Sequence, residues 1–508
     1  MFWIIISIVF LGLLMRHQFN KRRFFRLLGV QCANTYPLFG CLPEAMKMGV
    51  LSHDIWSIRK YGRVFGTYLG NLPNLVVADP KLIREIFVCQ FHKFPQRMQA
   101  LYISEWWDNC VVMAKGDHWR YMRSIITPAF NSVALRNMHT RTETCLEKLT
   151  TFLTEKVNGR VEFEFDMRTL FGALTLDILC YTSFGQETNN LKNENNEFSR
   201  HAKILSTLNI ETNALNGLPM ILPFTKPVFR FLRLDYVNTE SLNYIKKVIE
   251  DMISFRSCQN GMHKDTLQNL VNATGSFDDQ QQIDDGNTNL ISNPFKTRKH
   301  QGLNQDEIIA NAIVVLMAGY DTTATTLTWM AYLLATNMDV QLKLVKSIDE
   351  HADISGTDYD SVMKLDYLDW FLSETLRLYP AANRTGRDTD IDTEVCGLKV
   401  RRGLSITVPI YAIHRMPEYW SEPEKCIPER FSPENMEKII PFTYLPFGVG
   451  PRACLGIKMA KMLCKVIMVK VLQMYTFHVC SKTEINPVLE TSLLTKPKNG
   501  LWLTLRKR

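Results

Sequence analysis

The most regular hydrophobic pattern in the chain is the run 308–334, IIANAIVVLMAGYDTTATTLTWMAYLL, which is apolar on nearly every helical face. A helix that is apolar all round is either buried in a large core or spans a membrane. Asn304 followed by Glu307 resembles a capping box at its start, with Asn in place of the usual Ser or Thr. Asp321 and the threonines beside it argue against a span. The pattern therefore predicts a long buried central helix whose polar middle marks a site.

The rest of the chain is mostly helical in pattern, with one clear exception near the start. Residues 61–79, YGRVFGTYLGNLPNLVVAD, alternate aromatic and β-branched runs with Gly and Asn-Leu-Pro, which predicts a β-hairpin. Residues 257–302 are rich in Asn, Gln, Asp, Gly and Thr, so we expect a solvated, partly disordered insertion. The fold class predicted is mainly α with a smaller β region (α+β).

The amino terminus carries an uncharged apolar run, residues 1–15, followed by Arg16 and a basic stretch from Lys21 to Arg26. As a helix this run spans only about 22 Å, against a hydrocarbon core of about 30 Å, and extension through His17 and Phe19 closes part of the gap. A cleaved signal peptide has its positive charge before the apolar run, whereas here the charge comes after it. The basic flank should stay cytosolic.

These features predict a single-pass signal anchor over residues 1–20, with the first residues in the lumen and the body of the protein in the cytosol. A basic flank and linker over 21–45 and a catalytic domain over 46–508 would follow. The alternative is a buried amino-terminal helix.

Composition excludes several protein classes. The 508 residues carry 59 basic and 51 acidic side chains, so the formal net charge is 59 − 51 = +8. With 46% apolar and 22% charged residues, the chain is neither disordered nor collagen-like nor a multi-span membrane protein. Its 12 cysteines are sparse and none forms a CxxC pair, which disfavours a disulfide scaffold or a zinc ribbon. No nucleic-acid-binding module is present in the sequence, and no nucleic-acid partner is expected.

One cysteine has unusual neighbours. The segment 447–456, FGVGPRACLG, places two glycines and a proline before Cys454, and an apolar helical run follows it. A thiol at a helix amino terminus meets the positive end of the helix dipole, which favours the thiolate that binds metals. Glycines there let the backbone approach a flat ligand closely.

This segment fits F-x-x-G-x-R-x-C-x-G without departure and resembles the haem-binding loop of the cytochrome P-450 superfamily, the haem-thiolate monooxygenases. Glu374 and Arg377 match that family's E-x-x-R pair, and Arg430 in PERF resembles the residue that completes its buried network. The resemblance runs from about residue 35 to the end and is closest to the microsomal branch of drug- and steroid-oxidising enzymes and thromboxane synthase. It implies the cytochrome P-450 fold.

The resemblance also implies a haem site. Cys454 would ligate the iron, and Trp119 and Arg123, in the pattern W-x-x-x-R, would contact a propionate. Guanidinium groups pair well with carboxylates, so Arg452 is a second propionate candidate. The complete set of predicted cofactor-binding residues is Arg97, Trp119, Arg123, Ala318, Arg387, Phe447, Arg452 and Gly456.

On the central helix, AGYDTT (318–323) resembles the family's oxygen-activation motif. Gly319 would remove bulk where the cofactor and O₂ must fit, and Thr322 would bond back to a helix carbonyl. Asp321 and Thr322 are the predicted catalytic residues, since a carboxylate beside a hydroxyl can relay protons to oxygen. The family more often has Glu at the position of Asp321.

The activity implied is insertion of one oxygen atom of O₂ into a steroid, sterol, fatty acid or xenobiotic at the endoplasmic reticulum membrane. The chain has no dinucleotide fingerprint, so NADPH electrons would come through a cytochrome P-450 reductase, with cytochrome b5 as a further donor. Lys458, Lys461 and Lys465 lie on one helical face, which would either dock the reductase or simply be a solvated face. The alternatives are an isomerase or dehydratase of lipid peroxides that needs no reductase, and a non-catalytic haem sensor or carrier.

Two further features concern the substrate. The apolar, proline-broken segment 217–231 falls where relatives dip a loop into the membrane, although a buried core segment is the alternative. The residues expected to line the substrate pocket are mostly apolar, which fits a lipophilic substrate. They are Leu101, Trp106, Trp107, Ala318, Thr322, Ala382, Asn383, Leu493 and Leu494.

Overall fold

The computed structural model describes most of the 508 residues. The described ranges are 2–98, 106–157, 159–193, 196–206, 218–222, 225–232, 237–257, 265–273, 302–351, 358–490 and 493–508. Helices dominate these ranges. They are α1 (Phe2–Leu27), α2 (Leu42–Met48), α3 (Val50–Tyr61), α4 (Pro80–Arg84), α5 (Gly116–Ile126), α6 (Ser132–Val157), α7 (Met167–Phe184), α8 (Glu197–Ser206), α9 (Leu218–Ile221), α10 (Lys226–Phe231), α11 (Thr239–Ser257), α12 (Thr266–Asn272), α13 (Gln305–Thr336), α14 (Met338–His351), α15 (Tyr359–Met363), α16 (Asp366–Leu378), α17 (Ile410–Ile413), α18 (Pro433–Met436) and α19 (Ile457–Met474).

Short 3-10 and π turns join several of these helices, and the nine strands within the described ranges form three small sheets. The turns are η1 (Glu85–Cys89), η2 (Phe91–Lys93), η3 (Trp106–Asn109), η4 (Thr127–Phe130) and η8 (Pro428–Phe431). The strands are β1 (Val64–Leu69), β2 (Leu72–Val77), β3 (Glu162–Asp166), β4 (Thr385–Asp388), β5 (Thr393–Val395), β6 (Leu398–Val400), β7 (Ser405–Val408), β8 (Tyr475–Val479) and β9 (Trp502–Lys507). The predicted α+β class is therefore observed.

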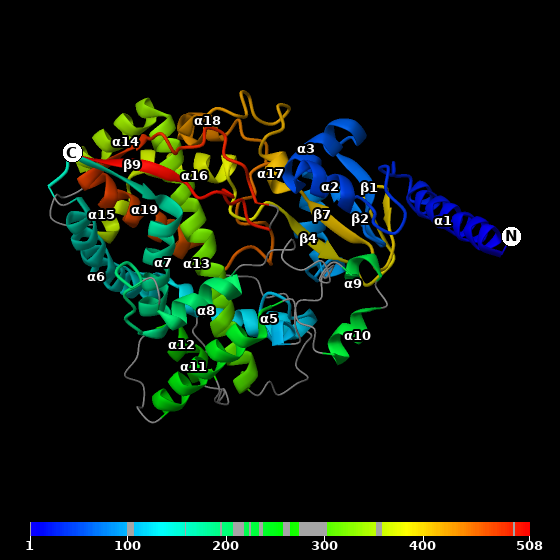
Figure 1. The fold of residues 1–508 in the computed structure, drawn as a ribbon, viewed down its shortest axis with the longest axis horizontal. Coiled ribbons are helices and arrows are strands. Elements are labelled where there is room, and N and C mark those ends of the chain that lie inside the picture. Colours follow the sequence, from blue (N-terminus) through cyan, green and yellow to red (C-terminus); the bar gives the residue numbers. More distant parts are fainter. Residues whose placement is uncertain are drawn as a thin grey trace, which may run out of the picture.

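Helix α13 runs through the middle of the helical part of the molecule, between α7, α16 and α19 (Figure 1). The predicted capping box is present: Glu307 N donates to Asn304 Oδ1 at 2.9 Å, and Asn304 N donates to Glu307 Oε2 at 3.0 Å. Among the described helices, α13 alone is long and apolar enough to cross a membrane, but 72% of its most apolar window is buried inside the fold. It is the buried core helix that the sequence predicts.

The largest sheet lies at the other side of the molecule, beside α2 and α3 (Figure 1). Its strand order is β1-β2-β7-β4, so the predicted hairpin, β1 with β2, pairs with strands from the carboxyl-terminal half. Strand β2 runs parallel to β7, whereas β4 runs antiparallel to β7. The antiparallel sheet β3-β9-β8 and the hairpin β5-β6 complete the β structure. These pairings fix residues 385–388 beside the helical core, where the site lies.

The amino-terminal helix differs from the sequence prediction at its carboxyl end. Helix α1 continues to Leu27, seven residues past the predicted anchor. Phe25 is fully buried against Gly66 of β1. Lys21, also buried, donates to Gly70 O at 3.1 Å and lies over the Tyr68 ring. Residues 21–45 are therefore a structured part of the sheet region rather than an extended linker.

The polar insertion also differs in part. Most of 257–302 lies outside the described residues, but α12 falls inside it. Leu267 and Leu270 of α12 are buried in the core, and Asp265 before it forms a buried ion pair with Arg256, Nη1 to Oδ1 at 2.6 Å. Residues 265–273 thus belong to the packed domain.

Candidate active site

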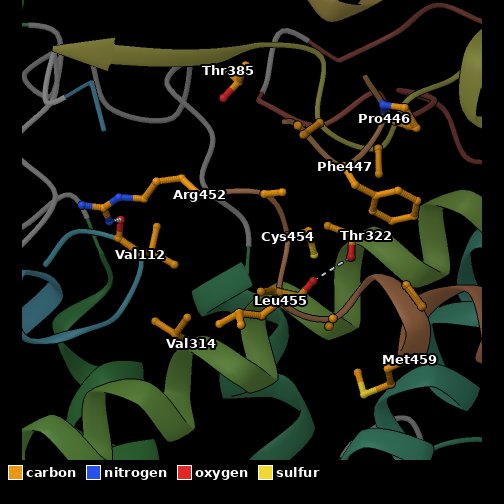
Figure 2. A pocket seen from close by; sticks show the side chains of 18 of the residues that line it. Val112, Val314, Thr322, Thr385, Pro446, Phe447, Arg452, Cys454, Leu455 and Met459 are labelled. Carbon is orange, nitrogen blue, oxygen red and sulfur yellow. Dashed lines mark hydrogen bonds between the residues drawn. The ribbon is translucent and has the colours of Figure 1, made fainter. Parts of the chain in front are cut away.

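A cavity of about 310 Å³ lies between α13, α5, the segment 446–456 before α19, and the segment 381–387 that leads into β4. Figure 2 shows Cys454 in this cavity, with Thr322 on α13 close by and Arg452 pointing to one side. All the predicted site residues except Asp321 line this cavity, namely Arg97, Trp119, Arg123, Ala318, Thr322, Arg387, Phe447, Arg452, Cys454 and Gly456. The structure therefore brings together residues from five distant segments of the chain.

The cysteine loop has a tight, glycine-dependent backbone. Gly448 and Gly450 both have positive φ angles, +70° and +75°, which L side chains rarely adopt. A Cβ at Gly450 would lie 1.9 Å from Phe87 O, so no larger residue fits there. The Cys454 amide donates to Phe447 O at 3.0 Å, which closes the loop. This geometry presents the Cys454 thiol to the cavity two residues before Gly456, the N-cap of α19.

The pKa of the Cys454 thiol is shifted upwards, opposite to the direction expected at a helix amino terminus. Burial raises the pKa of the Cys454 thiol, and this outweighs the Gly456 backbone hydrogen bond and the Arg97 and Arg123 guanidinium groups, which lower it. A metal cation bound to Cys454 would favour the thiolate, because a coordinating thiol loses its proton.

Five arginines line the same cavity; Arg384 is paired with Asp54, and the other four are Arg97, Arg123, Arg387 and Arg452. Arg452 is almost fully buried, donates to Ala114 O at 2.7 Å and to Pro95 O at 3.0 Å, and lies over the Trp119 ring at 4.1 Å. Arg97 donates to Arg452 O and Arg123 donates to Ala453 O, both at 3.0 Å. Arg387 is 1% exposed and donates to Gly386 O. Arg97 and Arg123 thus hold carbonyls of the cysteine loop, whereas Arg452 and Arg387 hold carbonyls of other segments around the cavity.

These cations lack an anion. Within the described residues none of the four forms an ion pair, and Nε of both Arg97 and Arg387 is buried without a hydrogen-bond partner. Burial lowers the pKa of Arg452 to about 9 and that of Arg387 well below its usual value, with the neighbouring arginines adding to the effect. Buried charges are stable only when they are paired. The site thus fits a ligand with two carboxylates, as the haem propionates are.

Thr322 and Gly319 give α13 its role in the cavity wall. Thr322 Oγ1 donates to Ala318 O at 2.6 Å, the backward bond that the sequence predicts. Gly319 lines the cavity, as expected, and it also lets α7 and α13 pack closely, because a Cβ there would meet Leu179 of α7 at 3.0 Å.

Asp321 points elsewhere. Its carboxylate forms an ion pair with Lys496, and both side chains are nearly buried, with 12% and 5% exposed. The partner of this mid-helix carboxylate comes from the carboxyl-terminal segment.

The E-x-x-R pair forms the buried network that the resemblance implies. Arg377 Nε donates to Glu374 Oε2 at 2.7 Å, and Arg430 Nε donates to Glu374 Oε1 at 3.2 Å. Arg377 Nη1 also donates to His414 O and Pro423 O, both at 2.8 Å. This network fixes α16 to the segment before the cysteine loop and takes no part in the cavity.

Some sequence predictions are wrong. Lys465 cannot dock a partner, because it is 2% exposed and its Nζ donates to Met363 O at 2.9 Å. Several residues expected in the substrate pocket do not line the cavity, namely Trp106, Trp107, Asn383, Leu493 and Leu494. Leu101 lies outside the described residues. The predicted pocket residues Ala318, Thr322 and Ala382 do line the cavity, and its apolar wall also includes Val111, Val112, Val314, Val315 and Ala381. The spacing of Val314 and Val315, one turn before Ala318, could have indicated two of these.

Comparison with known proteins agrees with this geometry. The family model for cytochrome P450 matches residues 30–504. The chain belongs to the cytochrome P450 family. It is 32% identical to "Cytochrome P450 3A11" of Mus musculus and 30% identical to "Cytochrome P450 3A5" of Homo sapiens, in each case over 100% of this chain and 96% of the relative. "Cytochrome P450 3A27" of Oncorhynchus mykiss is 30% identical over 95% of this chain and 90% of the relative.

As a cytochrome P450, the protein is a haem-thiolate monooxygenase, and the residues around the cavity fit a haem site. Cys454 would hold the iron, and the four arginines and Trp119 would hold the propionates. When bound, haem supplies activation of O₂ for insertion into a C–H bond. The protein's own share is to orient the substrate, exclude water and deliver protons.

Proposed function

We propose that this cytochrome P450 inserts one oxygen atom of O₂ into a lipophilic substrate, such as a steroid, sterol, fatty acid or xenobiotic. The observation that carries the proposal is the cavity itself. It combines Cys454, four arginines without anions and a wall of valine and alanine side chains from 111–112, 314–315 and 381–382. An apolar wall selects an apolar substrate because each buried CH₂ group contributes about 0.8 kcal/mol.

Asp321 and Thr322 are the proposed catalytic residues. Thr322 lines the cavity, and the hydrogen bond that its hydroxyl donates to Ala318 O fixes the orientation of its side chain. It can hold a water molecule or pass a proton at its Oγ1 atom. The Asp321 carboxylate is the nearest acidic group along α13, but it must leave Lys496 before it can act.

The electrons would come from NADPH through a cytochrome P450 reductase, or through cytochrome b5. Of the three lysines expected to dock the reductase, Lys458 is exposed and Lys461 is partly exposed. Both lie on the first turns of α19, directly after the cysteine loop. Charge reversal at Lys458 should raise the reductase concentration that gives half-maximal turnover, and an unchanged value would remove this site.

The protein would work at the endoplasmic reticulum membrane, held by an anchor over residues 1–20. Support comes from exposed apolar side chains in the segment 217–231 that was predicted to dip into the membrane. Val228 and Phe231 of this segment are exposed, Phe231 by 86%, and so is Leu232, which follows it. Deletion of residues 1–20 should leave part of the protein bound to phospholipid vesicles. Complete release of the shortened protein from the vesicles would show that only the anchor contacts the membrane.

The function is tested by supplying isotopically heavy O₂. The haem-loaded protein, a microsomal reductase and NADPH would be mixed with sterols, steroids and fatty acids, and mass spectrometry would search for products carrying one heavy oxygen atom. Thr322→Ala should lower the yield of labelled product relative to NADPH consumed. Turnover of a lipid peroxide without NADPH, and no labelled product, would instead show an isomerase.

A further inference from the structure

A second cavity, of about 370 Å³, lies between the carboxyl end of α3 and the segment 412–418, which begins in α17. Figure 1 shows α17 beside α3, on the side of the molecule that holds the largest sheet. No residue that lines this cavity also lines the cavity that contains Cys454. It is therefore separate from the site described above.

The second cavity contains a buried cation whose hydrogen bonds are incomplete. Arg415 lines the cavity and is 7% exposed. Its Nε donates to Glu424 Oε2 at 3.2 Å, but its Nη1 is buried and has no hydrogen-bond partner among the described residues. The Glu424 side chain is 71% exposed, so solvent screens its charge. A buried donor without an acceptor is costly, and native structures keep few of them without a water molecule or ligand as partner.

The position of Arg415 is fixed by its neighbours. Its guanidinium group lies over the Tyr411 ring, 3.8 Å from the ring centroid. Its amide donates to Ala412 O at 3.0 Å. The preceding residue, His414, accepts a hydrogen bond at Nε2 from Leu445 N at 2.8 Å. Arg415 can thus receive a ligand without rearrangement of the chain, and a preorganised site loses less conformational freedom on binding.

Two further arginines line the cavity nearer the solvent. Arg59 is exposed and forms no ion pair within the described part of the chain, whereas Arg63 donates from Nη1 to the Tyr419 hydroxyl at 3.2 Å. Arg63 Nε also lies 3.8 Å from Glu418 Oε2. The lining therefore holds three guanidinium groups and one carboxylate. Even when Glu424 is counted, one positive charge is left over, so the lining lacks an anion.

The rest of the lining is largely apolar. Ile58, Ala412 and Met416 are buried, and Ile55 is partly buried. An apolar surface beside a few charged groups favours a ligand that has both kinds of group. Guanidinium groups bind phosphate through paired hydrogen bonds, and a phosphate monoester offers three acceptor oxygens and about two negative charges near neutral pH. It fits three guanidinium groups better than a singly charged carboxylate does.

We propose that this cavity binds a small organic phosphate, that is, a phosphate monoester that carries an apolar group. The phosphate would accept hydrogen bonds from Arg415, Arg59 and Arg63, and the apolar group would lie against Ile58 and Met416. The proposal goes beyond the proposed oxidation and does not rest on it, because the two cavities share no residue.

The test is calorimetric titration of the haem-loaded full chain at constant ionic strength with three probes: phenyl phosphate, inorganic phosphate and benzoate. Phenyl phosphate should bind at one site per chain, about fivefold more tightly than either of the others. Inorganic phosphate lacks the apolar group, and benzoate lacks the second charge. The haem absorption spectrum should stay unchanged, because the probe does not enter the haem cavity.

Two variants and a matched control locate the binding site. Arg415→Met should raise the dissociation constant for phenyl phosphate by about tenfold. Arg59→Met, at an exposed position where folding should be unaffected, should raise it by about threefold. Lys60→Met removes an equal charge from the next residue of α3, but Lys60 does not line the cavity, so this variant should bind phenyl phosphate as the wild type does.

The proposal is overturned if phenyl phosphate shows no saturable binding, or if benzoate binds as tightly. Wild-type affinity in Arg59→Met and Arg415→Met would also overturn it. An equal loss in Lys60→Met and Arg59→Met would show attraction to the general surface charge instead of a site. A changed haem spectrum would place the probe in the haem cavity and likewise contradict the assignment.

Discussion

Removal of the charge on Glu374 tests how the buried network holds the cysteine loop. Both oxygens of Glu374 accept from Arg377, at 2.7 and 2.9 Å, and Oε1 also accepts from Ile427 N at 2.9 Å and Arg430 Nε at 3.2 Å. Neither Glu374 nor Arg377 has any exposed side-chain surface. Glu374→Gln keeps the shape but leaves two guanidinium groups without their anion and places an amide donor against other donors.

Loss of one partner from a buried pair costs about 3–5 kcal/mol. We expect Glu374→Gln to lower the free energy of unfolding by that amount and to reduce the haem retained per protein molecule, because the network joins α16 to the segment before Cys454. The assay is urea unfolding followed by circular dichroism, with haem content measured on the same samples.

The matched control is Asp360→Asn. Asp360 also makes a bidentate pair with an arginine, Arg136, at 2.8 and 3.0 Å, but both side chains are more than half exposed. Solvent screens such a pair, so its loss should leave the urea midpoint unchanged within error. Equal shifts in the two variants, or no shift in Glu374→Gln, would refute the reasoning from burial.

Three further outcomes follow from the structure. Gly450→Ala should abolish haem retention, measured by absorption of the purified protein, because the new Cβ would collide with Phe87 O. The control is Gly397→Ala, which should retain haem, because a Cβ at Gly397 meets no atom within 4 Å and the φ angle is similar. Arg387→Gln should weaken haem binding, seen as faster haem transfer to apomyoglobin, since Arg387 is a buried cation without an anion. Burial lowers the pKa of His414 to about 3, so the unfolded chain binds a proton that the folded protein does not. Stability should therefore fall as pH drops below about 6.5, and between pH 6.5 and 5 the wild type should lose about 2 kcal/mol more than His414→Gln in urea titrations.

The sequence was sufficient for the parts of the site that lie in short motifs. The Cys454 loop and the helix segment around Thr322 can each be recognised from about ten residues, because glycine conformation and helical periodicity are local properties. Arg97 and Arg387 were found only through the family resemblance, since a lone arginine gives no sign that it is buried. The structure shows why these two arginines matter: both line the cavity, where neither forms an ion pair with a described acidic residue.

The remaining differences come from contacts between distant segments. Lys496 lies 175 positions after Asp321 in a short segment that looks like a solvated turn, so nothing local indicates the ion pair. Lys465 shares a helical face with two lysines nearer the surface, and only the packing of α15 on α19 shows that it is buried. Gly319 lines the cavity as the sequence predicts, but its second role, making room for Leu179 of α7, depends on a contact that the sequence does not show.

The central claim, that Cys454 is the thiolate ligand of a haem iron, is tested most directly by X-ray absorption at the iron edge of the purified protein. A sulfur neighbour of iron should be present in the wild type and in Cys145→Ser, a buried cysteine of α6 that does not line the cavity. It should be absent from Cys454→Ser. A sulfur shell that persists in Cys454→Ser would contradict the account.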